Sequence, residues 1–299
     1  MFIPLRRSIS EIIFRRNNSN FALFRQPSPL LAKGLVTGTY VAKAKSVDSK
    51  LALAQWKNYV QVFKDNNWVI NLVPSLDDHP DGVFIEDNVV SLNNTGVGQP
   101  LMMITRSKSD DRRAETTSLK KFLEKNSQPF SPVALKPGGF LEGGDVLRVG
   151  STTYIGKSSR SDQRGIDSYQ DLVNVHENVI SVPVTKALHL KSCMTSVKLS
   201  DRYILLAHPS NVCEEMENAL KTEHEIVWVP EIEGTAVVDL SSGSGSGNGN
   251  GPLLLSAAAP KTRQMLEEKF GYTCIAVDIS EFEKMEGCVT CLSVRRRGL

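Results

Sequence analysis

The feature that most constrains this chain is an order of secondary structure that the sequence predicts five times. Each copy has a strand, a turn, a second strand, a helix and a short final strand, over about 45–55 residues. One copy alone cannot bury its apolar faces, so neighbouring copies must pack against one another. The last strand of the chain is predicted to complete the first copy, which closes the row into a ring. The sequence therefore predicts an α/β protein, a pseudo-fivefold α/β-propeller of five hairpin–helix–strand repeats.

Hydrophobic periodicity sets the bounds of the predicted elements. In the first helix, for example, Ala52, Trp56, Tyr59 and Phe63 recur at helical spacing. The predicted helices cover residues 47–66, 111–125, 165–176, 212–222 and 261–270. The predicted strands cover residues 21–26, 68–73, 83–92, 101–105, 133–135, 141–149, 153–155, 179–184, 188–199, 203–207, 226–229, 236–240, 253–256, 273–277 and 286–294. A doubly wound sheet is the alternative, but the paired hairpin strands and the lack of a glycine-rich phosphate loop favour the ring.

Composition narrows the class of protein. The chain has 299 residues, of which 40% are hydrophobic and 23% charged, and this is ordinary globular usage. A net charge of +2 gives no reason to expect nucleic acid or a membrane surface as a partner. No apolar run approaches the ~20 residues of a membrane span. Neither nucleic acid nor a membrane is therefore expected as a partner.

Two segments lie outside the repeats. Residues 1–20 carry four arginines and one acid, which predicts a basic tail, with a mitochondrial presequence as the alternative. Residues 241–251 consist of serine, glycine and asparagine inside the fifth hairpin, and we expect a flexible surface loop there. Residues 21–299 are predicted to form a single catalytic domain. Five widely spaced cysteines favour reduced thiols and a cytoplasmic protein.

Polar residues recur where the first strand of each hairpin would approach the ring axis. They are Glu86, Asp87, Glu142, Asp145, His189 and Cys291. Buried carboxylates, an imidazole and a thiol that converge from different repeats favour a catalytic site. Cys291, on the predicted strand 286–294, is the candidate nucleophile, and His189 is the candidate acid and base, although a histidine between leucines also suits a core position. Cys288 and Cys291 form a C-x-x-C without a second pair, so a zinc site is poorly supported.

The most specific local signal is Leu141-Glu142-Gly143-Gly144-Asp145. Two glycines after a carboxylate allow another group to approach the backbone closely, and a simple bulge is the alternative.

Four separated motifs together resemble dimethylarginine dimethylaminohydrolase, of the guanidino-group-modifying superfamily with the fivefold pentein fold. They are the glycine motif above, residues 188–191 (Leu-His-Leu-Lys), residues 83–87 (Val-Phe-Ile-Glu-Asp) and residues 287–293 (Gly-Cys-Val-Thr-Cys-Leu-Ser). The motifs occur in the family's order, and the similarity runs from about residue 21 to residue 294.

The resemblance implies hydrolysis of Nω-methylated arginine to citrulline and a methylamine through a covalent thiouronium intermediate. Cys291 would attack the guanidinium carbon, His189 would protonate the departing amine and later activate water, and Glu142 would orient His189. Residues implied to bind the substrate are Asp81, Glu86, Asp87, Arg112, Arg160, Leu35 and Glu286. No metal or organic cofactor is implied.

One position departs from the family pattern. The family usually has an aspartate where this chain has Glu286, and the longer side chain moves the carboxylate about 1.5 Å further. This change leaves the reaction class in place and makes the preferred substrate less certain. An arginine deiminase, another guanidino hydrolase and a catalytically idle binding homologue stay open as alternatives, as does a homodimer.

Overall fold

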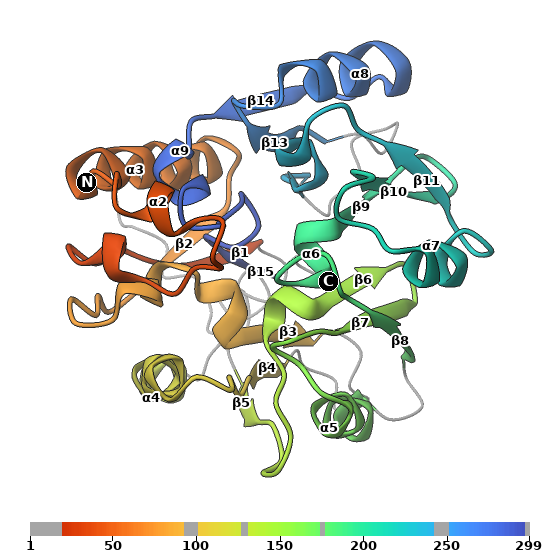
Figure 1. The fold of residues 1–299 in the computed structure, drawn as a ribbon. Coiled ribbons are helices and arrows are strands. Elements are labelled where there is room, and N and C mark those ends of the chain that lie inside the picture. Colours follow the sequence, from red (N-terminus) through yellow and green to blue (C-terminus); the bar gives the residue numbers. More distant parts are fainter. Residues whose placement is uncertain (1–19, 93–100, 127–130, 174–176, 242–250, 297–299) are drawn as a thin grey trace, which may run out of the picture.

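The computed structural model describes residues 20–92, 101–126, 131–173, 177–241 and 251–296. The basic tail, the turn at 93–96, the end of the third predicted helix and most of the Gly/Ser loop lie outside these residues. The described chain forms five three-stranded sheets arranged around a centre (Figure 1). The predicted fivefold α/β ring is confirmed.

Every sheet has the same order and the same mixture of directions. Its first strand pairs antiparallel with the second, and its third pairs parallel with the second. The sheets are β15-β1-β2, β3-β4-β5, β6-β7-β8, β9-β10-β11 and β12-β13-β14. The strands are β1 (Phe21–Arg25), β2 (Val69–Val73), β3 (Val89–Leu92), β4 (Leu101–Ile104), β5 (Ser131–Ala134), β6 (Val146–Val149), β7 (Thr152–Lys157), β8 (Asn178–Pro183), β9 (Met194–Lys198), β10 (Tyr203–Ala207), β11 (Glu225–Trp228), β12 (Val237–Asp239), β13 (Leu253–Ser256), β14 (Cys274–Val277) and β15 (Val294–Arg296).

One long helix joins the second and third strands of each sheet, because parallel neighbours need a crossover connection. These outer helices are α3 (Ser49–Asp65), α4 (Asp110–Lys125), α5 (Gln163–Val173), α7 (Glu214–Leu220) and α8 (Pro260–Phe270). The Asp48 side chain accepts hydrogen bonds from two amides at the start of α3, and Gly271 ends α8 at a φ of 70°. Among the described residues, no helix combines the length and apolar character that a membrane crossing needs.

The outer helices bury the faces that periodicity predicts. Ala52, Trp56, Tyr59 and Phe63 of α3 are all buried, and Phe63 packs edge to face on Phe24 of β1 with ring centroids 5.0 Å apart. In α4, Leu119 is buried, and the partly buried Phe122 packs against the core cluster that contains Leu119.

The ring closes through β15, which completes the sheet begun by β1. Leu23 pairs with Val294 and Phe21 with Arg296. The prediction that the last strand completes the first copy is therefore confirmed, but its bounds are wrong. Residues 286–293 form turns instead of a strand, and the Cys291 amide donates to the Cys288 carbonyl at 3.1 Å.

The same correction applies to three other first strands. The segments predicted as single strands at 83–92, 141–149 and 188–199 each contain a one-turn helix before a shorter strand. These helices are η3 (Ile85–Asn88), η4 (Gly143–Asp145) and α6 (Leu190–Cys193). A fully extended chain would run past the axis, whereas a helical turn there lets each segment enter the centre and then join its sheet.

Candidate active site

The one-turn segments carry nearly all of the predicted chemistry. Glu86 and Asp87 lie in η3, Glu142 directly precedes η4, and His189 directly precedes α6. Cys291 lies in the turn before β15. The segments contact one another, since the Glu86 amide donates to the Cys291 carbonyl at 3.2 Å. Equivalent positions of four repeats therefore meet at one end of the ring axis.

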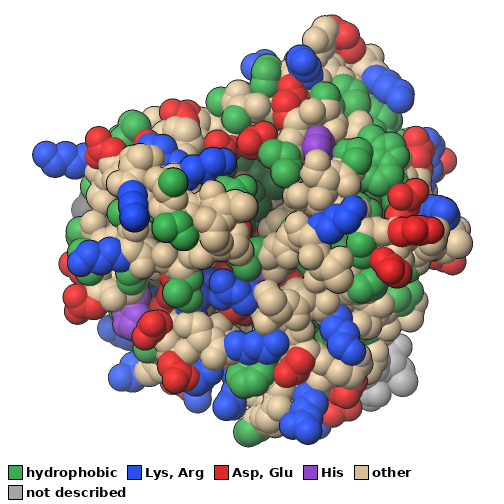
Figure 2. All heavy atoms as spheres, in the orientation of Figure 1, with side chains coloured by type: hydrophobic (Ala, Val, Ile, Leu, Met, Phe, Trp, Pro, Cys, Tyr) green, Lys and Arg blue, Asp and Glu red, His purple; other side chains and the backbone are tan. Residues whose placement is uncertain are grey.

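Eight of the predicted residues line one small pocket of about 20 Å³. They are Leu35, Asp81, Asp87, Arg112, Arg160, His189, Glu286 and Cys291. Phe84, Leu188, Met285 and Gly287 complete the wall. Prediction from sequence missed the three apolar members, although Phe84 and Leu188 stand inside the quoted motifs. An outer pocket of about 430 Å³ lies beside it and is lined by Glu233, Glu283, Glu286 and Cys288, among others. The space-filling view shows a hollow near the centre of this face (Figure 2).

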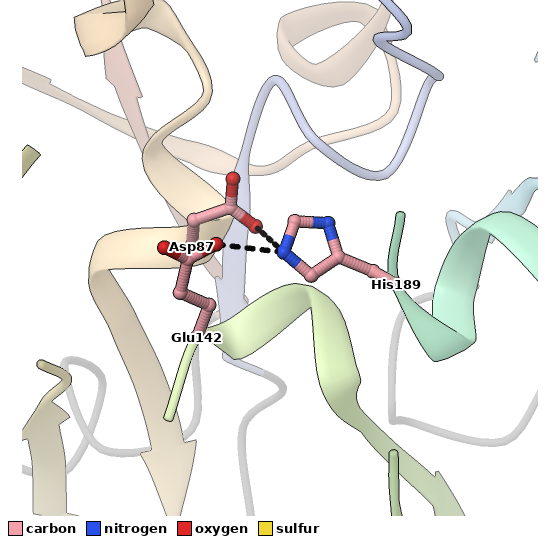
Figure 3. A group of neighbouring side chains, drawn as sticks. All are labelled: Asp87, Glu142 and His189. Atoms are coloured by element: carbon pink, nitrogen blue, oxygen red, sulfur yellow. Dashed lines mark hydrogen bonds and ion pairs between the residues drawn. The ribbon is translucent and has the colours of Figure 1, made fainter. Parts of the chain in front are cut away.

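His189 forms a buried ion pair with Glu142. Its Nε2 lies 2.7 Å from Glu142 Oε2 and 3.8 Å from Asp87 Oδ1 (Figure 3). Burial alone would lower the pKa of His189, but Asp87, the bond to Glu142 and the charge of Asp145 raise it to about 9. Burial likewise opposes ionisation of Glu142, yet the bond to His189 and the charges around it lower the pKa of that carboxyl to about 2. At neutral pH the pair is therefore an imidazolium and a carboxylate.

Other groups fix the orientation of Glu142. The Ser107 hydroxyl donates to Glu142 Oε1, and Arg160 Nη1 lies 3.7 Å from the same oxygen. The Glu142 amide donates to Ser161 Oγ at 3.1 Å. Because Glu142 is completely buried, its side chain has few alternative positions. Ser107 is a site residue that no sequence motif indicated.

Gly143 and Gly144 allow the close approach that the sequence suggested. A Cβ at Gly143 would collide with the Glu86 carbonyl oxygen, and one at Gly144 would lie 2.7 Å from His189 Cγ. Neither glycine has a positive φ, so space and not backbone conformation requires them. The simple bulge is excluded as the explanation of this motif.

Asp145 has a structural role beside the pair. Its Oδ2 accepts from the hydroxyls of Ser158 and Ser161, each at 2.6 Å, and its Oδ1 accepts from the Leu190 amide at 2.9 Å. Burial raises the pKa of this carboxyl, with the charge of His189 as the main opposing influence. Asp145 thus holds the start of α6, and with it the backbone next to His189.

Arg112 is buried and already engaged. Its Nη1 lies 2.7 Å from Asp87 Oδ2, and its Nη2 lies 3.1 Å from Glu115 Oε2. Nη2 also donates to the carbonyls of Asp81 and Phe84 at 3.3 and 3.1 Å. In this geometry Arg112 orients Asp87, and the side chain of Arg160, 18% exposed, is the freer of the two predicted arginines.

Glu86 does not face the pocket. Its Oε1 lies 2.6 Å from Lys191 Nζ and 2.8 Å from Arg295 Nη2. Burial opposes its ionisation, but these two cations lower the pKa of Glu86 below its usual range. Its side chain lines a separate cavity of about 510 Å³, on the side of β3 and β6. The expected contact of Glu86 with a substrate is therefore not supported, because the adjacent carboxylates of η3 point to opposite sides.

Two thiols stand side by side at the pocket. Cys288 Sγ lies 3.2 Å from Cys291 Sγ, whereas a strand over 286–294, as predicted, would have put these two side chains on opposite faces. The hydrogen bond from Cys291 lowers the pKa of Cys288 to about 7, so Cys288 is the first of the two thiols to ionise. That same bond, followed by burial and by nearby carboxylates, raises the pKa of Cys291. In this structure Cys291 is therefore a neutral thiol.

The turn that carries Cys291 is held from behind. The Tyr59 hydroxyl donates to the Val289 carbonyl at 2.6 Å and lies 2.8 Å from Ser293 Oγ. Tyr59 belongs to the buried face of α3, so the outer helix of the first repeat fixes the position of the turn.

Comparisons with known proteins agree with the geometry. The model of the family described as "N,N dimethylarginine dimethylhydrolase, eukaryotic" matches residues 37–295. An N(G),N(G)-dimethylarginine dimethylaminohydrolase of Streptomyces coelicolor is 39% identical over 282 residues, which cover 94% of this chain and 98% of that protein. One from Pseudomonas aeruginosa is 27% identical over 88% of this chain and 96% of its own length.

Solved structures show the same fold. A cysteine-to-serine variant of the Pseudomonas aeruginosa dimethylarginine dimethylaminohydrolase, in complex with citrulline, has a TM-score of 0.75 and 25% identity, and 92% of this chain and 98% of that chain are covered. The N-terminal domain of ArgZ, an arginine dihydrolase from cyanobacteria, reaches a TM-score of 0.78 at 18% identity over 93% of this chain and 98% of that chain, and this likeness concerns the fold alone. This chain belongs to the dimethylarginine dimethylaminohydrolase family, whose function is the hydrolysis of methylarginine to citrulline.

Proposed function

We propose that this chain hydrolyses Nω-methylated L-arginine to L-citrulline and a methylamine, with Cys291 as the nucleophile. The observation that carries the proposal is the arrangement at one pocket of a thiol, a charged imidazole paired with a carboxylate, and three further carboxylates. Family membership supports the same reaction.

The pocket suits a guanidinium. Asp81, Asp87 and Glu286 line it, and their carboxylates offer acceptors to a planar cation with several N–H donors. Holding the cation in one orientation is valuable because a guanidinium carbon is a poor electrophile and attack requires a defined approach. The same cation would favour the thiolate of Cys291, whose pKa is raised by the hydrogen bond with Cys288, by burial and by nearby negative charges.

When the substrate cation binds, the Cys291 thiol loses its proton to solvent; in the first step the resulting thiolate attacks the guanidinium carbon, and the bond from that carbon to the departing amine nitrogen breaks. The departing amine needs a proton, and His189 holds one at neutral pH because its pKa is raised to about 9. The product on the enzyme is a thiouronium. Glu142 keeps the imidazole in place and stabilises its positive charge.

In the second step, water replaces the sulfur. His189 is neutral after the first step, so it can accept a proton from the attacking water. The carbon–sulfur bond breaks, citrulline leaves and Cys291 returns to its starting state. The chemistry requires no metal or organic cofactor.

The amino-acid end of the substrate would meet arginine. Arg160 is partly exposed at the pocket wall and can form a forked contact with a carboxylate. Arg112, predicted for the same contact, would act mainly by orienting Asp87 unless its bonds rearrange when substrate binds. Leu35 would cover the bound substrate.

We also propose that residues 21–299 work as one catalytic domain in the cytoplasm. The pairing of β15 with β1, which joins the two ends of the described chain, supports a single unit. The basic first 20 residues keep mitochondrial import as the alternative, and a homodimer stays an open proposal.

The test is citrulline release from asymmetric dimethylarginine, with arginine in parallel and Cys291→Ser as the control. We expect release from the methylated substrate that the substitution abolishes. Faster release from arginine would favour an arginine deiminase that uses the same residues. No release from either substrate would favour an idle homologue.

A further inference from the structure

A loop between η1 (Leu31–Lys33) and α2 (Val41–Ala44) lies against two acids of the pocket. The Leu35 amide donates to both oxygens of Asp81, at 3.0 and 3.2 Å. Two residues later, the Thr37 amide donates to Glu286 Oε2 at 2.5 Å, and the Thr37 hydroxyl donates to Glu286 Oε1 at 2.8 Å. The loop therefore bridges two repeats across the pocket.

The loop fits closely in this position. A Cβ at Gly34 would collide with the Asp81 carboxylate and would lie 2.9 Å from the Met285 side chain. The remaining pocket of about 20 Å³ has room for about one water molecule and not for an amino acid. A bound amino acid therefore needs a wider pocket, and the contacts of this loop lie across the present one.

Glu286 reaches the loop because of its length and backbone. Its φ of 59° is left-handed, which is unusual for a glutamate and directs the side chain away from the course of the preceding turn. Within the described part of the chain, its carboxylate has no hydrogen-bond partner other than Thr37. An aspartate at this position would end about 1.5 Å short of that contact.

We propose that Thr37 and Glu286 form a latch that holds the substrate loop closed. Thr37 is then a positioning residue, which acts on the substrate through the loop and through Glu286. Glu286 also lines the pocket, so the contact that holds the loop closed positions a carboxylate that faces the substrate. The identity of the substrate rests on the proposed function, but the latch itself does not.

Hydrogen–deuterium exchange of the peptide that covers residues 34–40 tests the latch without any substrate. We expect Thr37→Val and Glu286→Asp each to speed exchange there by about 3-fold or more, which is the scale of one hydrogen bond. The matched control is Thr39→Val, because Thr39 is exposed on the same loop and makes no hydrogen bond to a described residue. Thr37→Ser keeps the hydroxyl and should restore slow exchange.

The double variant makes the test sharper. If the two residues form one contact, Thr37→Val with Glu286→Asp should exchange no faster than the faster single variant. Unchanged exchange in both single variants, or increments that add, would overturn the latch. Thermal unfolding of each variant shows whether the fold is intact, and Thr37→Ser provides the comparison if Thr37→Val is less stable.

Kinetics give the second measurement. With asymmetric dimethylarginine, Thr37→Val should lose about 3- to 10-fold in kcat/KM, mostly through KM, because closure over the bound substrate is weakened. A loss confined to kcat would contradict a positioning role. If the wild-type protein releases no citrulline, the proposed function fails, while the exchange experiment still decides the latch.

Discussion

The pKa of His189 can be tested by removing the charge of one carboxylate. Glu142→Gln keeps the size of the side chain and deletes a charge 2.7 Å from Nε2, while Asp87 and Asp145 still raise the pKa. The rise from 6.5 to about 9 corresponds to about 3 kcal/mol, at about 1.4 kcal/mol for each pKa unit. With one of three carboxylates gone, we expect the pKa to fall by about 1 to 2.

An NMR titration of the imidazole resonances measures this change directly. The chain has five histidines, and the signal that disappears in His189→Asn identifies the right one. The matched control is Glu124→Gln, which removes a glutamate that is 54% exposed on α4 and distant from the pair. A wild-type midpoint near 6.5, or the same midpoint in Glu142→Gln, would refute the reasoning.

The same pair predicts how stability depends on pH. The folded-state pKa of His189 is above the unfolded value, so its stabilisation is complete below pH 6.5 and is lost as the pH rises through about 9. The low pKa of Glu142 reflects the same ion pair, so its stabilisation is not added to that of His189. Urea unfolding at pH 6 and pH 9 should show a difference about 1–2 kcal/mol larger in the wild type than in Glu142→Gln, whose His189 keeps part of the raised pKa.

Further predictions concern the close packing, the thiols and the supporting helix. Gly144→Ala should displace His189, lower turnover at least about tenfold and destabilise the fold by about 1–3 kcal/mol in urea unfolding, and unchanged kinetics would contradict the tight contact. Cys288→Ala should lower the pH midpoint for alkylation of Cys291, because the hydrogen bond with Cys288 raises the pKa of the Cys291 thiol, and an unchanged midpoint would show that the thiols titrate independently. Tyr59→Phe should cost about 1–3 kcal/mol in unfolding free energy, and a chelator should leave turnover unchanged.

Much of the fold could be predicted from the sequence because each repeat combines a helical period with short alternating strands. The bounds predicted for β10 and β13 agree with the structure, and the other outer elements differ by a few residues at their ends. Such elements are fixed by local pattern and by burial of one face. The count of five copies, with the last strand returning to the first, then leaves a closed ring as the simplest way to bury the apolar faces of every copy.

The inner segments could not be predicted in the same way. Residues 83–92 and 188–199 alternate well enough to indicate strands, but η3 and α6 form there because the axis is crowded and their polar groups bond to other repeats. The residues of the site were predicted mainly from the order of the four motifs, and less from hydrophobic periodicity. The local sequence does not distinguish the roles of Glu86 and Asp87. Glu86 faces Lys191 and Asp87 faces His189, and these opposite directions depend on the helical turn that contains both residues.

The central claim is that Cys291, and not its neighbour Cys288, carries the covalent intermediate. Acid quenching during turnover of asymmetric dimethylarginine, followed by peptide mass spectrometry, tests it most directly. We predict an adduct on Cys291 with the mass of the substrate less dimethylamine, present in the wild type and absent in Cys291→Ser. An adduct on Cys288, or citrulline formation that persists in Cys291→Ser, would contradict the account.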